Sequence, residues 1–211
     1  MGGELQSSYD RVAQDYAGQF RDEMERKPFD RKMLDLLAEK VGGRGAVCDM
    51  GCGPGQVARY LHGRGVEACG VDLSQGMVEQ ARRLNPSIPF RQGDMLALEG
   101  VADDSFGGMA AFYSIVHVPR EKVVHALKEL RRVLRPGGVL LVAFHIGREV
   151  KHLDEMWGKE VSLDFLFFET AEVKGYLTAA GFALEEVIER EPYPEAVEYQ
   201  SRRAYVFARK E

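Results

Sequence analysis

A glycine-rich turn between a buried strand and a helix has the clearest chemical meaning in this sequence. Residues 47–55 read Val-Cys-Asp-Met-Gly-Cys-Gly-Pro-Gly. The glycines at Gly51, Gly53 and Gly55 let the backbone bend tightly and approach a ligand with no Cβ in the way. Asp72 ends the next strand, about 20 residues after the first glycine, where a carboxylate can accept both hydroxyls of a ribose. The pattern predicts an adenosine-containing cofactor at the carboxyl ends of these strands.

Two details favour S-adenosylmethionine (SAM) over a nicotinamide dinucleotide. The dinucleotide pattern is Gly-x-Gly-x-x-Gly, whereas here the third glycine comes one residue early and Gln56 stands in its place. Asp49, two residues before the first glycine, would repel a pyrophosphate but suits the ammonium group of a methionine moiety, directly or through water. An NAD(P)-dependent oxidoreductase on the same fold remains one alternative. The other alternative is that the glycines only form a tight turn between strand and helix and bind no ligand.

Strands and helices alternate along the chain in a way that places this turn at a sheet edge. Short apolar runs predict buried strands at 46–50, 66–71, 88–91 and 108–113, and the run 139–144 predicts a central strand covered on both faces. A quite polar helix is expected at 7–25, and further helices are expected after Pro28, at 56–62, after the N-cap Ser74, after Pro119 and at 170–180.

Two late strands, near 183–190 and 203–208, have no helix between them. They are expected to pair as a hairpin, which would leave one antiparallel strand in the sheet. The regular alternation before them predicts an α/β fold with a mostly parallel sheet and helices on both faces.

Length and composition fit one globular unit. The chain has 211 residues, 45% of them hydrophobic and 29% charged, which is enough for one large core and too little for two ordinary domains. The net charge of −5 gives no electrostatic footprint for nucleic acid. No run approaches the roughly 20 apolar residues that span a bilayer, and the N-terminus does not resemble a secretory signal.

The three cysteines, Cys48, Cys52 and Cys69, lie in the segment of the first two strands. An odd number so placed predicts buried free thiols in a reducing compartment, and hence a cytoplasmic protein. No second Cys or His pair accompanies Cys48 and Cys52 at zinc spacing, so no metal site is expected.

Five motifs resemble those of the class I SAM-dependent methyltransferases, close to the small-molecule group that includes the ubiquinone/menaquinone-biosynthesis enzymes. They are Asp-x-Gly-x-Gly-x-Gly at 49–55, Gly-Val-Asp-Leu-Ser at 70–74, Gln-Gly-Asp-Met at 92–95, Leu-Arg-Pro-Gly-Gly at 134–138 and Ala-Gly-Phe at 180–182. The resemblance runs from about Tyr9 to Ala208. One departure is Phe106-Gly107-Gly108, where the family usually carries Phe-Asp.

The resemblance implies a single methyltransferase domain over 1–211 with a Rossmann-like, doubly wound sheet of seven strands in the order 3-2-1-4-5-7-6, strand 7 antiparallel. It implies SAM as the cofactor, S-adenosylhomocysteine (SAH) as the product and a small-molecule acceptor, with no nucleic-acid partner and no membrane insertion. Asp72 would bind the ribose, Asp94 would accept from the adenine amino group and Met95 would pack on the ring. The residues expected to bind the cofactor are Tyr16, Asp49, Gly51, Cys52, Gly53, Gln56, Asp72, Leu73, Met77, Gly93, Asp94, Met95, Phe112 and Tyr113.

The acceptor side is less defined. The segment 112–117 follows the fourth strand and, by resemblance, lines the cofactor and acceptor pockets. His117 and His145 are the candidates for a base or an acceptor-orienting group, because an imidazole titrates near neutral pH. Each histidine could equally pack or cap without touching the acceptor. A base is needed only when the acceptor has a proton to lose, and a SAM-binding subunit without catalysis stays open.

Two segments are candidates for covering the site. The family often folds its N-terminal helix over SAM, which makes 1–27, with Tyr9, Tyr16 and Phe20, a lid helix; these aromatic side chains could equally only pack the helix onto the sheet. The segment 146–168 carries Trp157 and three phenylalanines and is longer than a simple connection. We expect it to cap an apolar acceptor pocket, with an extra helix that closes the core as the alternative. The sequence leaves the acceptor and the oligomeric state open.

Overall fold

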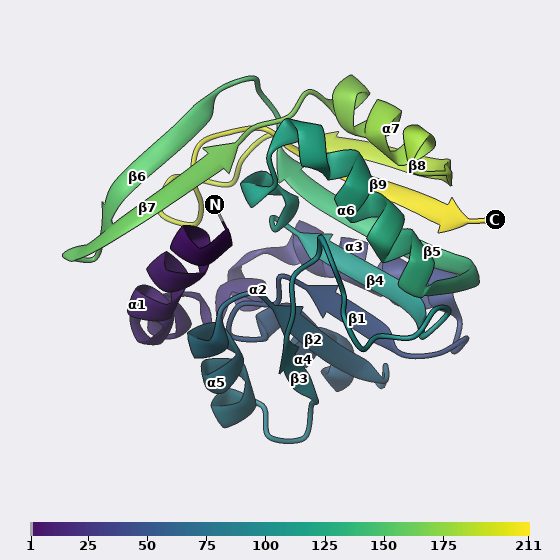
Figure 1. The fold of residues 1–211 in the computed structure, drawn as a ribbon, viewed down its shortest axis with the longest axis horizontal. Helices are drawn as coiled ribbons and strands as arrows, with labels where there is room; N and C mark the ends of the chain where they lie inside the picture. Colours follow the sequence, from purple (N-terminus) through teal and green to yellow (C-terminus); the bar gives the residue numbers. More distant parts are fainter. Residues whose placement is uncertain (1) are drawn as a thin grey trace.

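The computed structural model describes residues 2–211, and Figure 1 shows them as one twisted sheet between helices, with a separate hairpin at one end. The sheet has seven strands in the order β3-β2-β1-β4-β5-β9-β8. The strands of this sheet are β1 (Val47–Met50), β2 (Ala68–Asp72), β3 (Phe90–Gln92), β4 (Phe106–Phe112), β5 (Leu134–His145), β8 (Phe182–Arg190) and β9 (Arg203–Lys210). Strand β9 runs antiparallel to β5 and β8, and the other pairs are parallel. The predicted order and the antiparallel strand are confirmed.

The helices also follow the predicted alternation. They are α1 (Gly2–Phe20), α2 (Glu23–Arg26), α3 (Pro28–Val41), α4 (Gln56–Gly63), α5 (Gln75–Leu84), α6 (Arg120–Val133) and α7 (Thr170–Ala179), with a short 3-10 turn at Ile115–His117. Ser74 caps α5, since its side chain accepts a hydrogen bond from the Met77 N–H. The polar stretch predicted as one helix over 7–25 is broken after Phe20 and resumes as α2. Among these helices none is long and apolar enough to cross a membrane.

Alternation along the central strand β5 divides the core into two layers. Leu140 and Val142 pack with α6 and α7 on one face, where Leu127, Leu130 and Leu177 belong to the same buried cluster. Leu141 and Ala143 pack on the other face with α3 and α4. Because successive side chains of a strand point to opposite faces, a run of six apolar residues can serve both layers.

The departure from the family pattern at Gly107 has a packing reason. A Cβ built on Gly107 would lie 2.9 Å from the carbonyl carbon and oxygen of Arg44. The chain before β1 passes so close to the start of β4 that no side chain fits there. An aspartate at this position would require the two segments to separate.

The segment between β5 and α7 forms an antiparallel hairpin of β6 (Val150–Met156) and β7 (Lys159–Leu166). The alternative of an extra helix is therefore wrong. In Figure 1 the hairpin extends from the sheet on the side where α1 lies, and α1 contacts β7. The three cysteines are free thiols; Cys48 and Cys52 are buried and Cys69 is half-buried.

Truncation of Leu127 tests the layer under α6. Leu127 is fully buried between α6 and the sheet, and we expect Leu127→Ala to lower the free energy of unfolding by about 2–5 kcal/mol, because the cavity cannot fully collapse. Urea denaturation of both proteins measures the difference. Lys128→Ala, on the exposed face of the same helix, should stay within about 0.5 kcal/mol of the parent. Equal losses in the two variants would contradict this packing.

Candidate active site

One cavity of about 910 Å³ follows the carboxyl ends of the parallel strands. That volume is at the upper end of the range for ligand sites. Twelve of the predicted cofactor residues and both candidate histidines line it. They are Tyr16, Gly51, Gly53, Gln56, Asp72, Leu73, Met77, Gly93, Asp94, Met95, Phe112, Tyr113, His117 and His145. The motifs that are separate in sequence thus meet in one space.

Asp72 is the most constrained of the predicted ligand groups. One carboxylate oxygen accepts the Gly53 N–H at 2.8 Å and the other accepts the Ser74 N–H at 2.8 Å. The carboxylate therefore joins the turn after β1 to the turn after β2. Burial raises the pKa of Asp72 to about 6, against the opposing effect of these two hydrogen bonds.

The glycine turn leaves main chain and unpartnered polar groups facing the cavity. Gly51 and Gly53 have φ angles of +74° and +50°, in the left-handed region that favours glycine. A Cβ on Gly51 would collide with the Cβ of Ser114. The Ser114 hydroxyl and the Gln56 Oε1 are buried and have no hydrogen-bond partner in the described chain. Exposed backbone, the Asp72 carboxylate and two polar atoms without a partner together fit a ligand such as SAM.

Two predicted cofactor residues do not reach the cavity wall. Asp49 is 1% exposed and accepts the Ala58 N–H of α4 at 3.2 Å. Burial raises the pKa of its carboxyl group to about 8. Cys52 is also buried behind the turn. Asp49 therefore links the end of β1 to the first turn of α4. In this position its carboxylate does not contact the ammonium group of a ligand in the cavity directly.

His117 links the two covering segments. The Tyr9 hydroxyl of α1 lies 2.6 Å from its Nε2, and the Asp164 carbonyl of β7 lies 2.8 Å from its Nδ1. The carbonyl can only accept, so Nδ1 carries the proton and Nε2 accepts from Tyr9. Burial lowers the pKa of His117 to about 4. Both ring nitrogens are occupied, and the role of a base predicted for His117 is not supported by this geometry.

Further contacts fix α1 over the cofactor end. The Asp10 carboxylate accepts the Ser74 hydroxyl at 2.6 Å and the Gly76 N–H at 2.8 Å, next to the Asp72 turn. On its other side α1 meets the hairpin, where the buried Ser8 hydroxyl accepts the Ser162 N–H at 2.9 Å. The helix therefore closes the space between α5 and β7. Met1 of the predicted lid segment lies outside the described residues.

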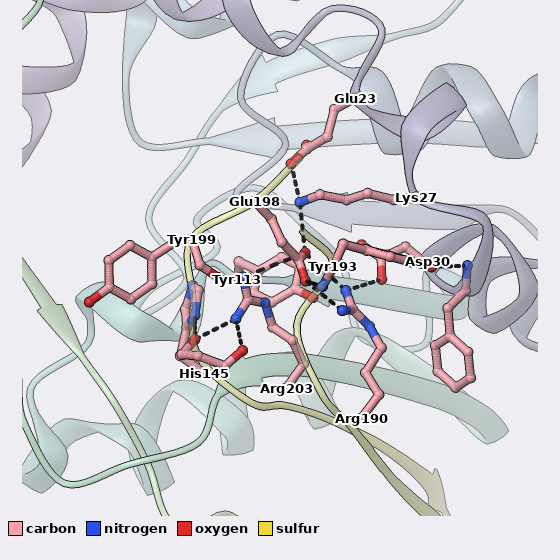
Figure 2. Close-up of polar contacts among 12 residues, drawn as sticks. Glu23, Lys27, Asp30, Tyr113, His145, Arg190, Tyr193, Glu198, Tyr199 and Arg203 are labelled. Carbon is pink, nitrogen blue, oxygen red and sulfur yellow. Dashed lines mark hydrogen bonds and ion pairs between the residues drawn. The ribbon is translucent and has the colours of Figure 1, made fainter. Parts of the chain in front are cut away.

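The opposite end of the cavity is a cluster of buried charges, shown in Figure 2. Lys27 lies between α2 and α3, Glu198 lies in the loop before β9, and Arg203 begins β9; the exposed fractions of these residues are 6%, 8% and 2%. Arg190 holds Glu198 through both carboxylate oxygens, at 2.5 and 3.0 Å. This pairing lowers the pKa of Glu198 to about 2 although its burial acts the other way.

Tyr113 sits where β4 ends, beside these charges. Its φ is +53°, in the left-handed region that a bulky residue rarely adopts. Its hydroxyl lies 3.0 Å from the Tyr205 hydroxyl, which donates to the buried Asp30. Lys27 and Arg203 lie 5.6 and 5.7 Å from the centre of its ring. The side chain is thus held by a hydroxyl chain at its tip and by two cations near its ring.

His145 ends β5 next to this cluster. Its Nδ1 lies 2.7 Å from the Ser201 hydroxyl, which also receives a hydrogen bond from Arg203. Its ring stacks on Phe167 with centres 4.9 Å apart, and it meets Tyr113 at 5.3 Å. Burial, then the cations Arg203 and Lys27, lower the pKa of His145 to about 3. The lowered pKa leaves the imidazole neutral near pH 7.

Reasoning from the sequence missed the charged end of the cavity. Glu23, Lys27, Glu198, Tyr199 and Arg203 all line it, yet they come from segments that share no spacing. One signal was available: Arg203 opens the apolar strand Ala-Tyr-Val-Phe, and a cation at such a place is usually paired or functional. Across residues 2–211 no group of His, Cys, Asp or Glu side chains has the arrangement of a metal site.

Comparison with known proteins finds a family domain in part of the chain and relatives along much of it. Residues 47–138 match the methyltransferase domain family. A malonyl-[acyl-carrier protein] O-methyltransferase of Enterobacter lignolyticus (strain SCF1) is 30% identical over 151 residues, 72% of this chain and 57% of that relative. A demethylmenaquinone methyltransferase of Beutenbergia cavernae is 36% identical over 113 residues, 54% of this chain and 45% of that relative. The chain spans about half the length of these curated relatives.

Two solved structures share the fold over most or nearly all of the chain. The 1,6-didemethyltoxoflavin-N1-methyltransferase of Burkholderia thailandensis matches with a TM-score of 0.74 over 99% of this chain and 88% of its own, at 21% identity. A SAM-dependent methyltransferase of Methanosarcina mazei matches with a TM-score of 0.70 over 78% of this chain and 92% of its own, at 18% identity. At such identities the similarity concerns the fold alone. With the domain match, it confirms the resemblance and the sheet that the motifs predict.

Removal of the Tyr9 hydroxyl tests the link between the covering segments. In Tyr9→Phe, Nε2 of His117 loses its hydrogen-bond donor. The free energy that holds α1 in its closed position should fall by about 1 kcal/mol. We expect amide hydrogens of α1 to exchange roughly fivefold faster, because this helix opens locally more often. Hydrogen exchange read by mass spectrometry measures it. Tyr60→Phe, which removes a hydroxyl bond to Asp35 away from the cavity, is the control. Unchanged exchange in α1 would mean that the link does not hold the helix.

Proposed function

We propose that this chain, which carries the domain of the class I SAM-dependent methyltransferases, transfers a methyl group from SAM to a small organic acceptor and releases SAH. The observation that carries the proposal is one covered cavity with two different ends. Asp72 and the glycine turn form one end, and the cluster around His145 and Arg203 forms the other. A cofactor site continuous with a second polar site is what transfer between two bound molecules requires.

The cofactor end supplies binding groups of the right kind. We assign the ribose hydroxyls to Asp72, which already has two fixed donors and is short of further ones. Asp94 lines the same end and accepts the Leu96 N–H at 2.8 Å with one oxygen. We assign the adenine amino group to its carboxylate, with Met95 and Leu73 beside the ring. Tyr16, Gln56 and Ser114 would then surround the methionine part.

SAM supplies a methyl group that its sulfonium charge already activates. The chain has to align the acceptor with that group and to keep water away. Tyr113 and His145 stand at the passage from the cofactor end to the charged end, so we assign them the alignment of the acceptor. His117 holds the covering segments together and is in our proposal a positioning residue.

The lid and the cap are part of the proposal. Segments 1–27 and 146–168 meet over the cavity through Tyr9, His117 and Asp164, and we infer that they part when ligands enter and leave. A cytoplasmic location, expected from the cysteines, stays a prediction.

The alternative of a nicotinamide-dependent oxidoreductase and that of a SAM-binding subunit without catalysis are separated by two measurements. Calorimetric titration with SAH and with NAD separates the cofactors, and we expect binding of SAH alone. Conversion of SAM to SAH in the presence of a metabolite library separates an enzyme from a binding subunit. Binding of SAH without turnover on any acceptor would favour the subunit.

Replacement of the ribose-binding carboxylate tests the cofactor assignment. We expect Asp72→Asn to weaken SAH binding about 10- to 100-fold, since charge-assisted hydrogen bonds contribute about 1.5–3 kcal/mol. Calorimetry at pH 7.5 measures the affinity. Asp103→Asn removes an exposed carboxylate that pairs with Arg132 far from the cavity and should bind as the parent does. Unchanged affinity in Asp72→Asn would contradict the placement of the ribose.

The pH dependence of binding gives an independent test of the same group. Burial raises the pKa of Asp72 to about 6, so the free protein carries a proton there below pH 6 that must leave before the carboxylate accepts two hydroxyls. Affinity for SAH should therefore rise up to tenfold per pH unit from pH 5 to about 6 and level off by pH 7. Asp72→Asn should show no such rise between pH 5 and 7. Parallel profiles for both proteins would assign the titration to another group.

A further inference from the structure

The charged end of the cavity contains a buried cation that hydrogen-bonds only to neutral groups. Arg203 is 2% exposed and lines the cavity. It donates to the Tyr199 carbonyl at 2.7 Å and to the carbonyl and hydroxyl of Ser201. Its Nε is buried and has no partner in the described chain. A buried guanidinium normally pairs closely with a carboxylate, so an idle N–H on this one indicates a place for a ligand.

The nearest carboxylate is already engaged elsewhere. Oε2 of Glu198 lies 3.5 Å from Nη2 of Arg203 but 3.0 Å from Arg190. Oε1 of Glu198 accepts from Arg190 at 2.5 Å and from the Tyr193 N–H at 2.7 Å. Arg190 thus forms the two-pronged pair with Glu198, and Arg203 is left with a longer, shared contact (Figure 2).

Lys27 adds a second cation at the same end. Its ammonium group lies 2.6 Å from Glu23 and 3.6 Å from Glu198, and the residue is 6% exposed. An ammonium group has three N–H donors, and the close contact with Glu23 uses one. Among the charged groups acting on His145, Arg203, Lys27 and Arg190 are cations and Glu198 is an anion. Glu23 pairs with Lys27 and Asp30 pairs with Arg190, so an anion would be held here by the N–H donors of Arg203 and Lys27 that lack a close carboxylate and not by an excess of positive charge.

Aromatic rings form the adjoining wall. His145 stacks on Phe167 at 4.9 Å and 23°, and Tyr199 meets both rings edge-on at 6.2 and 6.1 Å. Tyr113 lies 5.3 Å from His145 on the side of the cofactor end. Stacked and edge-on rings of this kind bind a flat ring through its face and edges.

We propose that the acceptor is a flat aromatic anion, whose charged oxygen is held by Arg203 and Lys27 while its ring lies against the wall of His145, Phe167 and Tyr199. The shared chemistry is a negative oxygen on a ring, which a carboxylate or an acidic phenol can supply. This acceptor class rests on the proposed methyl transfer, because it describes the second ligand of the same cavity.

Matched probes test the charge preference on the unaltered protein. We use 1-naphthoate and 1-naphthamide, which share shape and ring but differ in charge. Each is titrated by calorimetry into protein saturated with SAH. We expect 1-naphthoate to bind at least tenfold more tightly than 1-naphthamide. A further probe, 4-nitrophenolate, is charged at pH 8. It should also bind more tightly than 1-naphthamide if a phenolate oxygen is sufficient, and it should not do so if the site selects carboxylates.

Two variants locate the preference. Lys27→Gln should reduce the ratio of the naphthoate and naphthamide affinities at least threefold, and Arg203→Gln should abolish it. Because Arg203 also ties its loop to β9, circular dichroism checks that this variant folds, and Lys27→Gln carries the test where it does not. Lys128→Gln, which changes an exposed cation on α6, should keep the parent's ratio.

Equal affinities for naphthoate and naphthamide in the parent, or no binding of naphthoate, would overturn the acceptor class. Binding of SAH is measured first and separately. Normal SAH binding without a charge preference leaves the proposed methyl transfer standing and refutes the aromatic anion. If SAH does not bind, the proposed function fails, and titration of naphthoate into the ligand-free protein still decides whether the anion site exists.

Discussion

The site depends on a carboxylate that two backbone turns fix in place before any ligand arrives. Asp72 accepts one N–H from the turn after β1 and one from the turn after β2. Two donors leave half of the lone pairs of a carboxylate unused, and burial raises the pKa of the group to about 6. In the proposed complex the two adjacent hydroxyls of the ribose use these remaining lone pairs. The Asp10 carboxylate of α1 reaches the same turn, so the covering helix is anchored to the groups that fix Asp72.

The polarity of the cavity follows the order of the strands. Asp72 ends β2, the glycine turn ends β1, Tyr113 ends β4, His145 ends β5 and Arg203 begins the antiparallel β9. Four steps of about 4.8 Å separate β2 from β9, so the two ends lie roughly 19 Å apart. Carboxylates without a cationic partner mark the first end, and cations paired with Glu23, Glu198 and Asp30 mark the last. Because β9 runs backwards, its first residue, and not its last, reaches the ligand side of the sheet.

The sheet, its order and the cofactor end could be predicted from the sequence because their signals are local. A turn such as 49–55 fixes the backbone through its own glycines. The charged end could not be predicted, since Lys27, Glu198 and Arg203 come from three distant segments that meet only in the folded chain. The hairpin of β6 and β7 was not predicted for a different reason. Strand β6 is exposed on both faces along nearly its whole length, so it lacks the apolar alternation by which a half-buried strand is recognised.

The strained backbone at Tyr113 shows how the sheet supports the passage between the two ends. The Tyr113 N–H still donates to the Ala143 carbonyl at 2.9 Å, so the hydrogen bonding between β4 and β5 continues to the amide of this residue and ends there. Beyond that bond the chain turns through the left-handed region, at a cost of about 1–3 kcal/mol for a non-glycine residue. The hydroxyl chain to Tyr205 and Asp30 and the cations beside the ring offset this cost. This backbone conformation places the Tyr113 ring 5.3 Å from the ring of His145, in the lining of the cavity between the two ends.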